Sequence, residues 1–434
     1  MKEKEEGLKR YLGVLGLSAN IVNIIVGAGI FVIPAIVAEN MGSTSIIAYL
    51  FCGLLIALIM LCFAEAGSKV TDTGGGFAYV ETAFGKYPGF LIAVIALVGS
   101  LLADAAVANA LVDILGDSIP FFKQEMIRIV FFATVFFGLA FINIIGIKQG
   151  IGLVKVITLL KLTPLLLLIL IGWTDISISN LTWDTAPTIR QIGETSLILI
   201  FAFQGGEVGL IVGGEIKNPK KTVPRAIFAS ILTVLAIYIL IQTVTQGVLG
   251  NELANFKEAP LAETAKVIFG PIGFTILFIG AAISMFGNLT GEVLNNPRML
   301  FALARDKVIP IKKLALIHSK FRTPYFSILL YATIGFLIAT FGGFQQLINI
   351  ASAAVLLLYL AVVLSVIQLR RIRKAEPEEF KIPGGYIVPI LSAIIILYLL
   401  SNLTQTEKIG IIIFVGILTV IYGFIIYYKK KNND

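Results

Sequence analysis

The segment NIIVGAGIFVIP at residues 23–34 places a Gly-x-Gly within a hydrophobic stretch, where a membrane helix would otherwise be continuous. A second hydrophobic stretch is interrupted by FAFQGGE at residues 201–207. Backbone that lacks helical hydrogen bonds is tolerated at membrane depth only where it is buried in protein or lines a cavity. Two breaks at corresponding positions in two halves of a chain therefore predict the substrate site of a secondary transporter.

The composition also predicts a membrane protein. The chain has 434 residues, of which 57% are hydrophobic and only 14% are charged. A soluble domain of this size carries more charge and shorter apolar runs. We expect an all-α polytopic protein with one transmembrane domain over residues 1–434 and about 12 spans of the length that a bilayer requires. The expected spans are 12–38, 44–66, 88–115, 124–144, 149–172, 191–214, 225–249, 271–303, 324–341, 345–368, 386–402 and 409–428.

The net charge of +8 indicates membrane topology and not a nucleic-acid partner, because the basic residues gather on one side of the predicted spans. The side that we expect to be cytoplasmic carries Lys2, Lys4, Lys9, Arg10, Lys69, Lys86, Lys217, Lys220, Lys221, Arg225, Arg305, Lys307, Lys312, Lys313, Lys320, Arg322, Arg370, Arg371, Arg373, Lys374, Lys381 and Lys429 to Lys431. The opposite side carries Lys123, Arg128, Arg190, Lys257, Lys266 and Lys408. We therefore expect a multi-pass protein of the cell membrane with both termini in the cytoplasm.

Two segments differ from simple spans, and one span contains the two cysteines of the chain. Residues 74–85, GGGFAYVETAFG, are too short and polar to cross, and they predict an amphipathic helix at the inner surface. The span at 271–303 is overlong, so we expect its end from about Leu300 to project into the cytoplasm. Cys52 and Cys62 lie in one apolar span and are expected to be inert packing residues.

The breaks carry the chemistry that binding requires. The N–H groups of Gly27, Ala28 and Gly29 begin a new half-helix, whose positive dipole end attracts an anion such as an α-carboxylate. Glycine lets a ligand approach the backbone without meeting a Cβ atom, although close helix packing would also require small residues. Carbonyls freed on the other side of the breaks can accept hydrogen bonds from an α-ammonium, and they belong to Ile25, Val26, Phe201 and Ala202.

Several motifs in their order along the chain resemble those of the amino acid–polyamine–organocation (APC) transporters. They are residues 26–31, 74–79, 83–85, 201–207, 217–226 and 298–306. The resemblance implies a LeuT-like fold of five-plus-five inverted repeats, with broken helices 1 and 6, over about 12–172 and 191–368, followed by two extra helices at about 386–428. It also implies that an amino acid binds at the two breaks, the second of which contains Gly205.

The resemblance suggests roles for two aromatic residues before the second break. Phe203 falls where the family often places a gating aromatic over the substrate, although an aromatic in a membrane span can equally be a packing residue. Phe201 matches a position that is tryptophan in some relatives, which puts a cation–π contact there in doubt.

Two ionisable residues are candidates for ion coupling, because a charge at membrane depth is costly and normally faces a pathway or a partner. Lys161 matches a lysine whose ammonium, in sodium-independent members, stands where sodium-coupled relatives bind the ion. The resemblance thus implies proton coupling or exchange without sodium, and a buried lysine can load and release a proton. Glu207 follows the second break and matches a glutamate of cationic amino acid carriers, where coupling and structural bridging both remain open.

Two further acidic residues, Asp104 and Glu292, fall at depths that line the side-chain end of the family's pocket. Asn288 and Asn295 share a helix face with Glu292. The acidic excess over Lys161 gives a slight preference for cationic amino acids. Protonation, or pairing with Lys155, would leave a neutral amino acid as substrate, and a polyamine is a further alternative.

The sequence contains no signature of catalysis or of a cofactor. The single histidine, His318, has no second histidine to complete a triad or a usual metal site, and residues 74–76 lack the lysine of a phosphate loop. We expect no enzyme, no metal and no cofactor. The expected partners are an amino acid, protons and the lipid bilayer. The alternative to a transporter is a non-transporting receptor or a channel on the same scaffold. The sequence does not distinguish symport from exchange and does not specify the oligomeric state.

Overall fold

The computed structural model describes residues 12–71, 74–145, 148–183, 185–211, 216–305, 308–309, 311–321, 323–374 and 376–432. These residues are almost entirely helical, as predicted, and Leu12 and Ile216 form an isolated parallel β-bridge. The α-helices are α1 (Val14–Ile25), α2 (Gly29–Met41), α3 (Ser45–Lys69), α4 (Gly76–Phe84), α5 (Lys86–Ser118), α6 (Glu125–Ile145), α7 (Lys148–Gly172), α8 (Ile189–Phe203), α9 (Pro219–Leu249), α10 (Pro260–Phe269), α11 (Pro271–Asn295), α12 (Pro297–Arg305), α13 (Tyr325–Phe341), α14 (Phe344–Ile372), α15 (Ile387–Ser401) and α16 (Gln405–Asn432).

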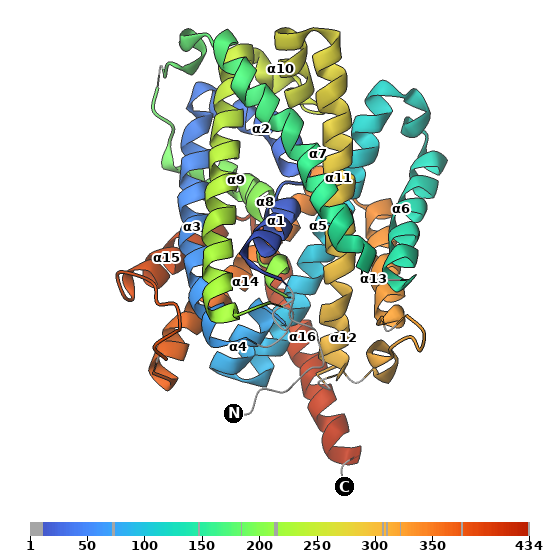
Figure 1. The fold of residues 1–434 in the computed structure, drawn as a ribbon. Coiled ribbons are helices and arrows are strands. Elements are labelled where there is room, and N and C mark those ends of the chain that lie inside the picture. The colour runs from blue at the N-terminus through green and yellow to red at the C-terminus, as the bar shows by residue number, and fades with distance from the viewer. Residues whose placement is uncertain are drawn as a thin grey trace.

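Helices occupy every predicted span. Within the described chain, eight helical segments are long and apolar enough to cross a membrane, and α1, α13 and α15 are shorter apolar helices. In Figure 1, α1, α8 and α14 lie in the middle of the bundle, between α3 on one side and α6 on the other. The short helices α4 and α12 lie at one end of the bundle and α10 lies at the opposite end (Figure 1).

The first predicted break is present between α1 and α2. Helix α1 ends at Ile25 and α2 begins at Gly29, so residues 26–28 separate two half-helices within one predicted span. The Gly27 N–H donates to Ile25 O at 2.8 Å, and the Ala28 carbonyl accepts the first hydrogen bonds of α2. The amides of Ala28 and Gly29 therefore stand at the start of the new half-helix, whereas the Gly27 amide is already paired.

The second break follows α8. The helix ends at Phe203, a turn covers residues 204–207, and a single 3-10 turn follows at Val208–Leu210. Gly205 has a φ of 103°, a conformation that side chains with a Cβ rarely adopt, so the turn requires glycine at this position. Helix α2 packs against α8, which brings the two breaks together in the centre of the bundle.

The overlong span at 271–303 is shared between two helices. Helix α11 ends at Asn295 and α12 begins at Pro297, so the division falls at Asn296, and Leu300, from which we expect the span to project into the cytoplasm, lies in α12. Pro297 lacks a backbone N–H and is favoured at the first position of a helix, so it starts α12 and ends the hydrogen bonding of α11. The short helix predicted within 74–85 is α4, whose Phe77, Tyr79 and Val80 are buried.

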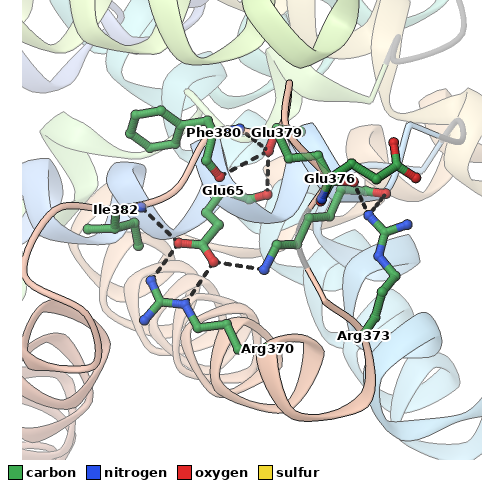
Figure 2. Close-up of polar contacts among 9 residues, drawn as sticks. Glu65, Arg370, Arg373, Glu376, Glu379, Phe380 and Ile382 are labelled. Atoms are coloured by element: carbon green, nitrogen blue, oxygen red, sulfur yellow. Dashed lines mark hydrogen bonds and ion pairs between the residues drawn. The ribbon is translucent and has the colours of Figure 1, made fainter.

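A buried ion cluster fastens the α14–α15 connection to α3. Glu65 of α3 is fully buried and accepts from Arg370 Nε at 2.8 Å and from Lys69 Nζ at 2.8 Å. The Ile382 N–H donates to the same carboxylate at 2.9 Å. Figure 2 shows Glu65 between the Arg370 guanidinium and the Ile382 backbone, with Arg373 paired to Glu379 close by. The cluster thus joins the end of α3, the end of α14 and the loop that follows α14.

We expect Arg370→Met to destabilise the protein by about 3 kcal/mol, because it leaves the buried Glu65 carboxylate without its bidentate partner. Unfolding of the purified protein in detergent measures the change. Lys220→Met is the control, because it breaks the exposed pair with Glu376, in which the lysine ammonium lowers the pKa of the carboxyl. Exposed pairs contribute little, so equal effects of the two variants would contradict this account of the cluster.

Candidate functional site

A cavity lies between the two breaks and is walled by residues of the two breaks, the start of α4, and α5, α11, α12 and α14. The predicted site residues that line the cavity are Ile25, Gly27, Ala28, Gly29, Asp104, Phe201, Gly205, Glu207 and Glu292. Those that do not line the cavity are Val26, Lys161, Ala202, Phe203 and Asn295. The cavity therefore unites backbone from both interrupted helices with three acidic side chains.

The glycines of the first break serve close packing. A Cβ placed on Gly29 would lie 2.5 Å from Ala202 Cα, which is closer than real atoms approach. A Cβ on Gly27 would lie 3.0 Å from Asn288 Cγ. The alternative of close helix packing thus applies directly at Gly29, where α2 meets the end of α8. The same absence of a Cβ exposes the backbone of the break to the cavity.

The carbonyls freed in the first break are bound by side chains from distant helices. Lys161 of α7 is fully buried, and its Nζ donates to Asn23 O at 2.5 Å and to Val26 O at 2.7 Å. The Ser284 hydroxyl of α11 also donates to Val26 O, at 3.0 Å. Lys161 therefore binds carbonyls at the end of α1 and in the first break, and it does not line the cavity.

Tyr238 of α9 joins the two breaks. Its hydroxyl lies 3.1 Å from Ile25 O and 2.9 Å from Ala202 O, close enough to donate to either carbonyl. Phe203 is 1% exposed and packs against the Tyr238 ring with the ring centroids 5.0 Å apart. Phe203 therefore packs away from the cavity, and Phe201 is the one of these two aromatic residues that lines it.

Two of the acidic residues belong to one hydrogen-bonded network. The Tyr331 hydroxyl of α13 donates to Asp104 Oδ2 at 2.7 Å. The Asn296 amide nitrogen donates to Tyr331 Oη at 2.9 Å and to Glu292 Oε2 at 2.6 Å. A tyrosine and an asparagine thus connect the carboxylates of α5 and α11. Asn295, the predicted neighbour of Glu292, instead donates to Gly291 O at 3.0 Å.

The third acidic residue, Glu207, organises the second break. Its carboxylate accepts from the Gly205 N–H at 3.1 Å and from the Tyr359 hydroxyl of α14 at 2.7 Å. These contacts close the turn after α8 and tie it to α14, which corresponds to the bridging alternative. The carboxylate also lines the cavity, so the geometry is compatible with a second role.

A family model described as amino acid permease matches residues 12–425. The chain belongs to the amino acid permease family. It is therefore a multi-pass membrane transport protein and not an enzyme.

Relatives of this permease match along nearly its whole length. The serine/threonine exchanger SteT of Bacillus subtilis is 30% identical, and the match covers 100% of this chain and 99% of the relative. The large neutral amino acids transporter small subunit 2 of Oryctolagus cuniculus is 28% identical over 97% of this chain and 80% of the relative. The methylthioribose transporter of Bacillus subtilis is 24% identical over 100% of this chain and 96% of the relative.

Sequence reasoning missed most of the polar partners in this permease. The missed partners are Tyr238, Ser284, Tyr331, Tyr359 and the backbone carbonyl of Asn23. A buried hydroxyl or amide within an apolar span signals a partner in principle, but which partner it meets depends on helix packing. The side chain of Lys155, with which pairing of Asp104 or Glu292 was the alternative, lies outside the described residues, as do Lys2, Lys4, Lys9, Arg10, Lys307, Arg322 and the side chains of Lys429 to Lys431.

Proposed function

We propose that this permease is a secondary active amino acid transporter that works by alternating access, independently of sodium. The observation that carries the proposal is the cavity that both interrupted helices line. Interrupted helices at the membrane midplane are the usual place for substrate in secondary transporters. The relatives named as amino acid transporters or exchangers support the same substrate class.

In the proposed binding mode, the α-carboxylate meets the amides of Ala28 and Gly29 at the start of α2. The α-ammonium meets the carbonyls of Ile25 and Phe201, which line the cavity. Gly27 lines the cavity without a Cβ atom, but it offers no free donor, since its N–H is bonded to Ile25 O. The carbonyls of Val26 and Ala202 do not contact the substrate in this mode. They accept hydrogen bonds from Lys161 and Tyr238 and so stabilise the two breaks.

Coupling to protons or to exchange is proposed for Lys161 and Glu207. The Lys161 ammonium binds the carbonyls of the first break, so loss of its proton would weaken the support of that break. Glu207 binds the Gly205 amide in the second break, so its protonation state bears on the conformation of the other interrupted helix. One ionisable side chain thus acts on each break.

The wider architecture that we propose has two inverted repeats, about 12–172 and 191–368, with the helices at about 386–428 added to them. The distribution of lysine and arginine supports both termini in the cytoplasm of a protein of the cell membrane. Under this topology, α4 and α12 lie at the cytoplasmic end of the bundle and α10 at the outer end.

Neutral amino acids are the second candidate class. Relatives named for serine and threonine or for large neutral amino acids favour them, whereas the acidic lining of this cavity favours a cationic substrate. The test of transport itself is counterflow. Liposomes that contain the purified protein and unlabelled amino acid should accumulate the labelled form transiently and saturably. Unsaturable flux would indicate a channel, and binding without flux would indicate a receptor.

A further inference from the structure

The network of Asp104, Tyr331, Asn296 and Glu292 has an open acceptor at the cavity. Asp104 is fully buried, and its Oδ2 accepts from Tyr331. Its Oδ1 is also buried and has no hydrogen-bond partner among the described residues. A buried carboxylate oxygen without a donor is costly. Because Asp104 lines the cavity, a donor carried by a ligand can satisfy this oxygen.

The groups around Asp104 Oδ1 are acidic or uncharged, which favours a cationic ligand. Asp104 and Glu292 accept hydrogen bonds from a phenol and an amide, which are both uncharged. Lys161, the fully buried ammonium of the central region, binds backbone carbonyls of the first break. Buried carboxylates without a cationic partner are strongly unfavourable in a membrane interior. The described residues thus supply acidic acceptors to the cavity, while Lys161 binds carbonyls outside its lining.

A continuous chain of hydrogen bonds connects the carboxylates of Asp104 and Glu292. Tyr331 has a single hydroxyl proton and donates it to Asp104, while the Asn296 amide holds both the Tyr331 oxygen and Glu292. Glu292 Oε1 lies 3.5 Å from the position that a Cβ on Gly205 would take, so it faces the second break. Tyr331 and Asn296 fix the carboxylates in orientation without lining the cavity themselves.

Granted the transport function proposed for the cavity, we propose that Asp104 and Glu292 bind the distal cationic nitrogen of the substrate side chain. Tyr331 and Asn296 are the positioning residues of this subsite. The substrate class is an amino acid with a terminal ammonium or guanidinium, whose α-carboxylate meets the first break. A diamine carries the same distal cation but lacks the carboxylate, and this difference separates the two sources experimentally.

The test measures binding of three probes to the purified full-length protein. Lysine is compared with 2-aminoheptanoate, in which a methyl group replaces the ammonium, and with the diamine cadaverine. We expect lysine to bind at least about tenfold more tightly than 2-aminoheptanoate, the ratio that one charge-assisted hydrogen bond supports. We also expect lysine to bind more tightly than cadaverine.

The variants separate recognition from general damage. Asp104→Asn should lower lysine affinity about tenfold and leave 2-aminoheptanoate affinity within about twofold. Tyr331→Phe should lower the ratio of the two affinities by about threefold or more, because Asp104 loses its fixed orientation. A merely structural role of Tyr331 would weaken both ligands equally and leave the ratio unchanged. Thr333→Val is the control on α13, because the Thr333 hydroxyl donates only to Leu329 O.

Equal binding of lysine and 2-aminoheptanoate to the unmodified protein would overturn the subsite and leave amino acid transport standing. Tight binding of cadaverine with no binding of either amino acid would overturn amino acid transport and leave the cation subsite standing. An unchanged affinity ratio in Asp104→Asn would also overturn the subsite. Failure of all three probes to bind would overturn the subsite too, and counterflow of a neutral amino acid by the same protein would then show that transport stands without it.

Discussion

Gly29→Leu is expected to abolish transport, and Gly29→Ala is expected to reduce it at least about tenfold. Even the smallest side chain places a Cβ 2.5 Å from Ala202 Cα and 2.7 Å from Ala202 Cβ. Backbone cannot yield as a flexible side chain does, so α2 and α8 must separate at the point where the two breaks meet. Overpacking of this kind typically costs about 1–3 kcal/mol, and here the displaced atoms are those of the proposed substrate site.

Initial uptake rates in proteoliposomes, normalised to the amount of folded protein, measure this effect. Gly138→Ala is the matched control, because Gly138 lies in the membrane helix α6 and a Cβ there meets no atom within 4 Å. The control should transport at the unmodified rate. Gly29→Ala with unchanged rate and affinity would show that the close approach of α2 and α8 is not needed for transport.

Lys161→Met is expected to lower transport at least about a hundredfold and to remove its dependence on pH. The substitution keeps the apolar stem but deletes the ammonium that binds Asn23 O and Val26 O. Asn23 O then loses its side-chain donor, and a buried carbonyl without a donor costs about 1–3 kcal/mol, so we expect the first break to lose its conformation. Ser284 still donates to Val26 O, which favours a protein that remains folded while the break is disordered.

The measurement is the pH profile of uptake, together with the unfolding temperature of the same preparation. Lys408→Met is the control, because Lys408 is partly exposed near the start of α16 and donates to Ser401 O, far in the sequence from either break. Its pH profile should match that of the unmodified protein. A folded Lys161→Met protein that retains proton-dependent uptake would remove Lys161 from the coupling mechanism.

The interrupted helices could be predicted from the sequence because their signals are local. Gly27 and Gly29 stand within an apolar run, and Gly205 occupies a turn that only glycine adopts readily. Such signals need no knowledge of distant neighbours. The division at Asn296 also has a local signal, because Pro297 favours the start of a new helix.

The partners within the site could not be predicted in the same way. Lys161 was singled out by its depth, but it bonds to carbonyls more than a hundred positions earlier in the chain. Tyr331 and Tyr359 reach Asp104 and Glu207 from helices whose placement no local pattern specifies. The orientation of Phe203 could not be predicted either. Its position beside the break is typical of a gate or of a packing residue, and in the structure its ring packs against Tyr238.

The decisive measurement is uptake of a labelled amino acid panel into proteoliposomes, in sodium-free buffer with and without an inward proton gradient. We expect saturable uptake without sodium, faster for lysine or arginine than for neutral amino acids, and driven either by the gradient or by amino acid preloaded into the liposomes. A strict requirement for sodium, or no flux of any amino acid under either driving condition, would contradict this expectation.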